Sequence, residues 1–541
     1  MGSKNEAVIE ALEARGFRYV GRDAQRWLSF VGDLRTSEGV YGCELEVDPE
    51  FYELPRVRLI TVPDALRPIA PHIGGNGSIC YLTKSTVVLD FFDPVGQTLR
   101  CIDEAQSVLG KVLRKEMVED LSEEFFIHWY ANQCLFDVQR AILGEVPGFC
   151  LLGRSGERYP VITDDLGATA LKLDVMGFEA KRERIPAYIV KTDVEPRPGQ
   201  KEWPPKTVAE FLEWQRQLDG RCARKVEQRL GEASRLTKLD ALVIIKSPKL
   251  LYGVHVHFDQ SVLPEEKHAI ARGTQRLYSY KISRLHVLRL DNEYLAQRNI
   301  PGMKTLAGKK IAVVGCGTIG GYLIDALAKA GAGTGGGHLT IVDYEVLGPQ
   351  NLGRHRLGMA HLFVNKASGM RLTLQFDNPS VSVRALEVDA RHAHLGTVDL
   401  LIDATGDESL GHWLAASYAN QIPMLSIWIE GPGIAVRGLM KMPGSSACYR
   451  CLCNHQRAGG LPTVEGAMPV LRAGHGCEGL YVPFPATVSL QAAALGAEMA
   501  LAWVNNAETP SLRTRITDSG YELATPDCDV LQAERCPACS Q

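Results

Sequence analysis

The sequence lacks an excess of charge of either sign. Its 59 lysines and arginines stand against 63 aspartates and glutamates, and the formal net charge is −4. Proteins that bind nucleic acid or an anionic membrane through charge usually carry a basic excess. The balance therefore gives no electrostatic reason to expect either partner.

Long apolar runs are also missing. We find no run of about 18 or more apolar residues of the kind that crosses a bilayer. The first 15 residues mix acidic and basic side chains, a pattern typical of neither a signal nor a transit peptide. We therefore expect a cytoplasmic protein. The 14 cysteines are then mostly reduced, so paired cysteines indicate metal sites or reactive thiols rather than disulfides.

The length predicts about three folded units. Residues 1–150 read as a compact α+β unit. Its expected elements are a helix at 3–14, strands at 27–31, 40–47 and 57–61, and helices at 103–113 and 125–142.

Residues 151–300 form an α/β middle domain in which no chemical constellation stands out. The expected strands are 188–191, 241–245, 253–258 and 285–290, and a charged helix covers 208–235. From residue 301 to 541, strands and helices alternate. This alternation predicts a doubly wound, mainly parallel sheet.

A glycine turn lies between the predicted strand 310–314 and the helix that follows. Gly315, Gly317 and Gly320 give the pattern GxGxxG. These glycines permit a tight turn and let phosphate approach backbone N–H groups at the helix N-terminus. Asp343 ends the next strand, where it can accept hydrogen bonds from a ribose. Alone, the pattern predicts a nucleotide site with NAD as the default occupant, or a purely structural turn.

Cationic residues downstream change the expected nucleotide. Arg354 and Lys366 follow Asn351, and a hydride-transfer site does not require these two cationic side chains. They suit a reaction that must neutralise a triphosphate and a developing pyrophosphate. Each alone could be a solvated surface charge, but together they favour ATP.

The C-terminal 240 or so residues resemble the ThiF/MoeB and ubiquitin-activating superfamily. The motifs that carry the resemblance are Gly315-x-Gly317-x-x-Gly320, Asp343, Asn351-x-x-Arg354, Lys366, Asp403-Ala404-Thr405-Gly406-Asp407, Cys448-x-x-Cys451, Cys477 and Cys536-x-x-Cys539. The resemblance implies Asp343 on the ribose, and Asn351, Arg354 and Lys366 near the phosphates. It implies Mg²⁺ on Asp407, although Gly406 is inserted before this residue. It also implies a homodimer in which one subunit completes the other's site.

Two CxxC hooks predict a zinc site. Four thiolates from Cys448, Cys451, Cys536 and Cys539 would make a closed, tetrahedral, structural Zn²⁺ site. The alternative is a set of unrelated free thiols.

Cys477 is the candidate nucleophile of this region. Glycines on both sides predict a mobile loop, and His475 could lower the pKa of its thiol. The resemblance implies that this cysteine attacks the acyl-adenylate, although some relatives only adenylate. Cys453 is the rival unpaired thiol.

A second cysteine lies in the N-terminal unit. The stretch from Pro71 to Leu82, Pro-His-Ile-Gly-Gly-Asn-Gly-Ser-Ile-Cys-Tyr-Leu, resembles the active-site stretch of ubiquitin-conjugating enzymes. Cys80 would be the thioester cysteine. His72 replaces the family's oxyanion-holding asparagine and can donate the same hydrogen bond. The alternative for Cys80 is a buried strand cysteine.

The order of the three units resembles one bacterial family, the CD-NTase-associated conjugation enzymes of type II CBASS antiphage operons. The resemblance implies ATP-dependent activation of a partner's C-terminal carboxylate. The acyl group would then pass through Cys477 and Cys80 to an amine of a target protein. The partner would be a cyclase with a flexible tail.

Three other classes stay open. A ThiF/MoeB-like sulfur-carrier adenylating enzyme would not need Cys80. An NAD oxidoreductase would need a hydride-transfer site, which we do not find. A non-enzymatic adaptor would carry an inert Cys80.

Overall fold

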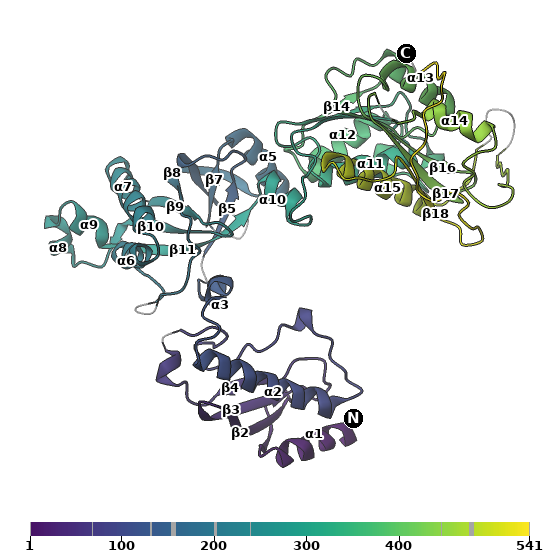
Figure 1. The fold of residues 1–541 in the computed structure, drawn as a ribbon. Helices are drawn as coiled ribbons and strands as arrows, with labels where there is room; N and C mark the ends of the chain where they lie inside the picture. The colour runs from purple at the N-terminus through teal and green to yellow at the C-terminus, as the bar shows by residue number, and fades with distance from the viewer. Residues whose placement is uncertain are drawn as a thin grey trace.

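The structure is a computed structural model. It describes residues 2–67, 69–129, 132–152, 158–199, 203–237, 240–444, 446–474 and 481–539. Figure 1 shows an N-terminal unit, a barrel in the middle of the chain and a C-terminal unit as separate bodies.

The N-terminal unit is an antiparallel meander covered by helices, as predicted. Its strand order is β1-β2-β3-β4, and alternate residues of β2 and β3, such as Phe30 and Leu45, are buried. Asp93 caps α2 by accepting a hydrogen bond from the Gly96 backbone, and Pro94 fills the first helical position. The elements are α1 (Gly2–Ala14), β1 (Arg18–Arg22), β2 (Leu28–Thr36), β3 (Gly39–Val47), β4 (Arg56–Leu59), η1 (Asp64–Leu66), η2 (Lys84–Thr86) and α2 (Pro94–Leu113).

The predicted helix at 125–142 is wrong. Short helices α3 (Asp120–Glu123) and α4 (Phe125–His128) are followed by the strand β5 (Asn132–Asp137). β5 pairs in parallel with strands on both sides, and its residues 134–137 are all buried. An apolar run buried on both faces carries no periodicity that separates strand from helix.

The middle of the chain closes into a barrel with strand order β10-β11-β5-β7-β6-β8-β9. Because β5 and β6 belong to it, the barrel begins before the predicted boundary at residue 150. The four predicted strands lie within β8 to β11. The remaining strands are β6 (Gly144–Leu152), β7 (Arg158–Thr163), β8 (Glu179–Lys191), β9 (Asp240–Lys246), β10 (Leu251–Ser261) and β11 (Tyr280–Arg289).

Helices cover the barrel on the outside. The predicted helix at 208–235 is broken at Asp219, whose carboxylate caps α7 by accepting from the Arg221 and Cys222 backbones. Trp129 donates its indole N–H to the Leu285 carbonyl at 3.1 Å and so anchors the segment that leads in from the N-terminal unit. The helices are α5 (Leu166–Met176), α6 (Val208–Leu218), α7 (Gly220–Leu236), α8 (Glu265–Ile270), α9 (Thr274–Tyr278) and α10 (Asn292–Gln297).

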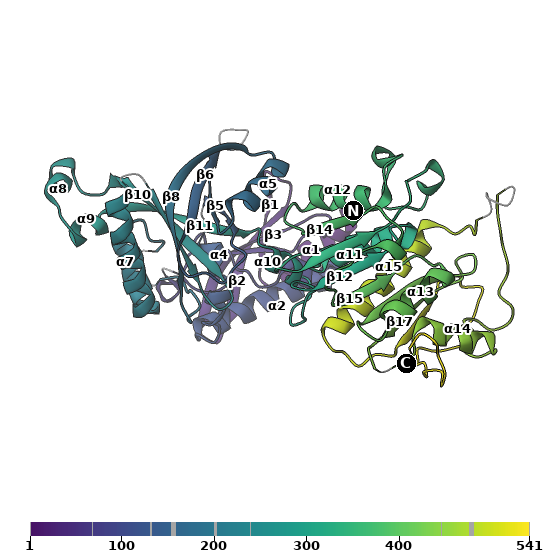
Figure 2. The ribbon, with the colours of Figure 1, turned by 90° about the horizontal axis from the view of Figure 1, so that it is seen from above.

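The C-terminal unit confirms the doubly wound, mainly parallel sheet. Its order is β14-β13-β12-β15-β16-β17-β18, in which only the pairings of β17 with its two neighbours are antiparallel. Figure 2 shows helices α11 and α15 running along the sheet. The strands are β12 (Lys310–Val314), β13 (His338–Val342), β14 (Val383–Leu386), β15 (Leu400–Asp403), β16 (Met424–Glu430), β17 (Ala435–Lys441) and β18 (Leu512–Ile516).

Helices cover both faces of this sheet. Alternate residues of β12 divide between two cores: Ile311 and Val313 pack with α11, α12 and α15, and Ala312 and Val314 pack with α13 and α14. The elements are α11 (Thr318–Lys329), η3 (Pro349–Asn351), η4 (Met359–His361), α12 (Lys366–Asp377), η5 (Ala390–His392), α13 (Glu408–Tyr418), α14 (Tyr449–Arg457) and α15 (Ala486–Val504).

Helix α15 qualifies the expectation that no segment could span a membrane. By length and composition alone it is the one helix, within the described ranges, that is long and apolar enough to do so. Half of its apolar stretch is buried in the protein, where Val488, Leu495 and Met499 belong to the core against the sheet. Buried core helices commonly have this composition.

Candidate active sites

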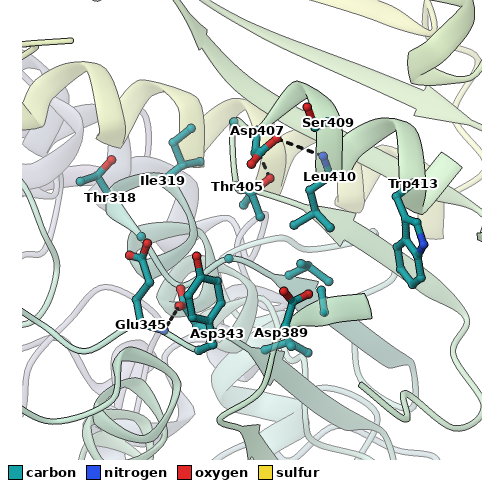
Figure 3. Close-up of a pocket in the computed structure, with 18 of the residues that line it drawn as sticks. Thr318, Ile319, Asp343, Glu345, Asp389, Thr405, Asp407, Ser409, Leu410 and Trp413 are labelled. Carbon is teal, nitrogen blue, oxygen red and sulfur yellow. Dashed lines mark hydrogen bonds between the residues drawn. The ribbon is translucent and has the colours of Figure 1, made fainter. Parts of the chain in front are cut away.

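A large cavity opens at the carboxyl ends of β12, β13 and β15 (Figure 3), with a volume of about 860 Å³. Ligands of open α/β sheets usually bind at this edge. Four of the predicted residues, Gly315, Gly317, Asp343 and Asp407, line this one cavity.

The glycine turn has the geometry that a nucleotide site requires. Gly315 has φ +91°, in the left-handed region. A Cβ on Gly320 would lie 1.8 Å from the Gly315 carbonyl oxygen, so only glycine lets α11 pack this close to the turn. Gly317 faces open space at the helix N-terminus. Two of the glycines thus shape the turn, while Gly317 leaves room for a phosphate.

Asp343 is fixed by two backbone N–H groups. Its Oδ2 accepts from Cys316 at 2.7 Å, and its Oδ1 accepts from Glu345 at 2.8 Å. Burial raises the pKa of this carboxyl above its usual range, while the two backbone hydrogen bonds oppose that shift. Each oxygen keeps a further lone pair, which a ribose hydroxyl could use.

Arg354 lies against the rim of the cavity. Its Nη1 donates to the Val482 carbonyl at 3.1 Å, and its guanidinium lies 4.5 Å from the Phe484 ring centroid. Both Val482 and Phe484 line the cavity. The Arg354 Nε is buried and has no hydrogen-bond partner among the described residues. A phosphate oxygen would satisfy this donor.

Lys366 and Asn351, the other two residues predicted to lie near the phosphates, make different contacts. Lys366 is only 5% exposed, and its ammonium pairs with Glu345, which lines the cavity. Asn351 turns to its own loop, where its Oδ1 accepts from the Gly348 backbone at 2.9 Å. Asn351 therefore shapes the loop that carries Arg354 in this structure.

The inserted Gly406 does not remove Asp407 from the cavity. Gly406 has φ +67°, and Asp407 then caps α13 by accepting from the Leu410 backbone at 3.0 Å. Asp407 is exposed and lines the cavity. It is thus placed where a metal-bound polyphosphate could reach it.

An ion pair that was not predicted from the sequence lies on the wall of the cavity. Arg391 contacts both carboxylate oxygens of Asp389, with its Nη2 2.6 Å from Oδ2, and holds the pKa of that carboxyl down at about 2. Both residues line the cavity. The sequence feature that could have predicted them is their position directly after β14, at the same sheet edge as Asp343.

His355 was also missed. Its Nε2 lies 2.7 Å from the Cys316 carbonyl oxygen, and its Nδ1 accepts from the Leu357 backbone at 3.0 Å. Burial lowers its pKa to about 4. A neutral imidazole thus ties the Arg354 loop to the glycine turn.

The two CxxC hooks come together. The Sγ atoms of Cys448 and Cys451 are 3.8 Å apart, those of Cys448 and Cys536 are 3.6 Å apart, and those of Cys451 and Cys539 are 3.5 Å apart. Four sulfurs each about 2.3 Å from one zinc would be separated by roughly 3.8 Å in a tetrahedron. All four cysteines are buried. The cluster could therefore bind zinc.

The rival nucleophile of the C-terminal unit, Cys453, is poorly placed to react. Cys453 is buried on α14, and burial raises the pKa of its thiol to about 11. A buried thiol with a raised pKa is a poor nucleophile. Cys477 lies outside the described residues.

Cys80 is exposed at the end of its glycine loop, which removes the buried-cysteine alternative. Its backbone N–H donates to the His72 carbonyl at 2.8 Å, and His72 has φ +60°. Partial desolvation and the negative charge of Glu124 raise the pKa of the thiol. The Sγ, a His72 ring nitrogen and a Glu124 oxygen all lie within 4.8 Å of one another.

Two carboxylates surround the His72 ring. Its Nε2 lies 2.9 Å from Asp120 Oδ2, and its Nδ1 lies 2.8 Å from Glu124 Oε1. A hydrogen bond from His72 to a thioester oxyanion would compete with these contacts, so the predicted oxyanion role stays a prediction. Asp120 and Glu124 were not predicted from the sequence, because they are more than 45 residues from His72.

Matches to known protein families span both candidate active sites. The ThiF family model matches residues 292–538, and the Prokaryotic E2 family B model matches residues 15–136. The chain is 49% identical over 536 residues, 98% of each chain, to the ATP-dependent ubiquitin transferase-like protein Cap2 of Pseudomonas aeruginosa. The chain belongs to the Cap2 family. It is therefore an enzyme of ubiquitin-like conjugation with a ThiF-type adenylation domain and an E2-like domain.

More distant Cap2 relatives match as well. The Cap2 proteins of Escherichia coli and Vibrio cholerae are 25% and 24% identical, covering 82% and 87% of both chains. A structure of E. coli MccB with ATP matches 43% of this chain and 66% of that chain, at 16% identity and a TM-score of 0.32. Matches to Cap2 along nearly the whole chain disfavour a lone sulfur-carrier adenylating enzyme and an adaptor without enzymatic activity.

Proposed function

We propose that the chain uses MgATP to activate the C-terminal carboxylate of a partner protein and transfers the acyl group through two thioesters to an amine. The observation that carries this proposal is the pairing, in one chain, of the cavity beside Arg354 with an exposed Cys80 beside Glu124. One site is suited to adenylation, and the other to holding a thioester.

The first step forms an acyl-adenylate. The partner's carboxylate oxygen attacks the α-phosphorus of ATP, and pyrophosphate leaves. Arg354 and Lys366 neutralise charge that develops on the phosphates, and Asp343 orients the ribose. Asp407 would help to hold Mg²⁺, which supplies further neutralisation of the polyphosphate.

Two thiol steps follow. The Cys477 thiolate attacks the acyl carbon, and AMP leaves. The Cys80 thiolate then attacks the Cys477 thioester, and the Cys477 thiolate leaves. Both cysteines belong to one chain, so the transfer avoids a diffusional encounter between separate enzymes.

The last step forms an amide. A target amine attacks the Cys80 thioester, the Cys80 thiolate leaves, and the amine loses a proton. Glu124 is the proposed acceptor of that proton, because its carboxylate is within reach of Cys80 and its side chain is 13% exposed.

The partner is a protein with a flexible C-terminal tail. The sequence resemblance to CBASS conjugation enzymes supports a CD-NTase cyclase as this partner and antiphage defence as the setting. The resemblance of the C-terminal unit to ThiF/MoeB proteins supports a homodimer, and the sequence composition supports a cytoplasmic location. The target is an amine-bearing protein.

The test uses purified protein, the partner and ATP with Mg²⁺. Mass spectrometry should find an ATP-dependent product joining the partner's C-terminal carboxyl to an amine, with a mass one water below the sum of the two molecules. A product that forms without ATP, or that uses another group of the partner, would overturn the proposal.

A further inference from the structure

A second cluster of metal-ligand side chains lies in the barrel, away from both active sites. Asp240 begins β9, and His255 and His257 lie on the adjacent strand β10. In the register of the two strands, His257 is directly opposite Asp240. Alternate residues of a strand point to the same face of a sheet, so the two histidines share one face. Leu242 is opposite His255 and belongs to the core that fills the barrel, so the cluster faces the barrel interior.

The donor atoms have the spacing of ligands around one ion. Asp240 Oδ1 lies 3.1 Å from His257 Nδ1 and 3.4 Å from His255 Nε2. Nitrogen and oxygen ligands about 2.0–2.1 Å from a tetrahedral zinc would be separated by roughly 3.3 Å. One ligand atom from each of the three residues lies within 4.8 Å of the other two.

Neighbouring groups orient the two rings. The second ring nitrogen of His257, Nε2, lies 2.9 Å from Ser283 Oγ. A proton on Nε2 donated to Ser283 leaves the Nδ1 lone pair directed at the cluster, which is how metal-ligating histidines are commonly held. The His255 Nε2 is buried and has no hydrogen-bond partner in the described part of the chain. Asp240 Oδ1, at 3.4 Å, forms no hydrogen bond with it, so a metal ion would give this nitrogen a partner.

We propose that Asp240, His255 and His257 bind a divalent transition-metal ion, for which Zn²⁺ fits the spacing. Two imidazoles and one carboxylate suit zinc or cobalt better than magnesium or calcium, which prefer oxygen ligands. Three protein ligands leave a fourth position for water. The side chains are 12–21% exposed, so an ion can enter from solvent. The site is independent of the cysteine cluster and of the proposed function.

The competing account is an ion pair, in which a protonated histidine takes the place of the metal beside Asp240. Both accounts explain the short contacts to Asp240. They differ in whether the folded protein takes up an ion at this position.

The test measures zinc in the full-length protein after equilibration with Zn²⁺ and desalting. Wild type should hold about two equivalents, one at each site. Asp240→Asn and His257→Gln should each hold about one. His286→Gln is the control, because His286 lies on the adjacent strand β11 and packs against Phe126 instead; it should keep wild-type zinc. Circular dichroism checks that each variant is folded.

Two further measurements keep the result decisive. Ser283→Ala removes the contact to His257, and competition with a chelator should show that the zinc affinity of one site falls about 10–100-fold.

Cobalt separates the two sites by their spectra. With Co²⁺, the cysteine site alone gives intense thiolate charge-transfer bands, so weaker bands that are lost in His257→Gln belong to the barrel site. If wild type and His257→Gln hold equal zinc and give equal cobalt spectra, the ion pair is the correct account. If the cysteine cluster binds no zinc, wild type should hold about one equivalent and His257→Gln none.

Discussion

Glu124 holds His72 at two points. One carboxylate oxygen accepts a hydrogen bond from the His72 backbone N–H at 2.8 Å, and the other lies 2.8 Å from the ring Nδ1. Glu124 lies directly before α4, whose Phe125 packs in the aromatic core between the barrel strands and helices α6 and α7. The loop that carries Cys80 is thus tied to the segment that leads into the barrel.

This contact predicts a specific defect in Glu124→Gln. Glutamine can still accept from the His72 backbone, but it cannot take a proton from an attacking amine. The Cys80 thioester should still form, and its discharge to lysine should slow by roughly 100-fold. Single-turnover discharge on gels measures this rate. Asp120→Asn is the control, because the Asp120 carboxylate contacts Nε2, the ring nitrogen on the other side from Glu124. This variant should slow discharge much less. Equal rates in wild type and Glu124→Gln would remove Glu124 from the chemistry.

Arg354→Ala should nearly abolish adenylation. The guanidinium lies at the rim of the cavity with a buried Nε that has no hydrogen-bond partner in the described ranges. Removing it should lower ATP–pyrophosphate exchange roughly 100-fold or more. Arg356→Ala is the matched control, because Arg356 pairs with Asp325 and Asp377 instead. It should exchange at nearly the wild-type rate. Calorimetry that finds NADH binding and no ATP binding would overturn the assignment of the nucleotide.

Loss of the cysteine cluster should unfold the end of the chain. Cys451→Ser removes one of the four proposed thiolate ligands, and a structural zinc contributes directly to folding. The variant should lose about one equivalent of zinc and become susceptible to proteolysis near residues 528–539. Cys222→Ser, at a buried cysteine on α7, is the control and should keep its zinc. A folded variant of Cys451 with unchanged zinc would rule this site out.

Acid should destabilise the C-terminal unit through His355. Burial lowers its folded pKa to about 4, whereas the unfolded chain binds a proton below about 6.5. The contribution of His355 to stability is therefore complete above pH 6.5 and is lost as the pH falls toward 4. Between pH 7 and pH 5 the loss is about 2 kcal/mol. Asp403 acts in the opposite direction, because burial raises its pKa to about 6 and the folded state gains a proton there.

The variant His355→Gln separates the effect of His355 on acid stability from the effect of Asp403. The variant retains Asp403, so the difference in acid sensitivity between wild type and variant reports on His355. Thermal unfolding at pH 7 and pH 5 should show that the variant loses less stability on acidification than wild type does. Equal shifts would show that His355 is not neutral in the folded protein.

The sequence predicted the parts of the sites that depend on neighbours in the chain. GxGxxG determines a turn by sterics, and CxxC places two sulfurs within a few ångströms, so both were predictable. The contact of Glu124 with His72 depends on tertiary packing. Asp389 and Arg391 are two residues apart and pair locally, but their place on the cavity wall depends on the order of the strands. Strand β5 was mistaken for a helix because Cys134, Leu135 and Phe136 are buried on both faces, which leaves no alternation to read.

The central claim is the order of the two thiols, and thioester trapping in two variants tests it most directly. Each variant is incubated with ATP, Mg²⁺ and the partner, and thiol-sensitive adducts are read on non-reducing gels. Cys80→Ala should carry the partner on Cys477 and make no conjugate, because the second thiol is missing. Cys477→Ala should still catalyse ATP–pyrophosphate exchange and carry no adduct. A Cys477→Ala protein that still charges Cys80, or a Cys80→Ala protein that still conjugates the partner, would contradict the relay.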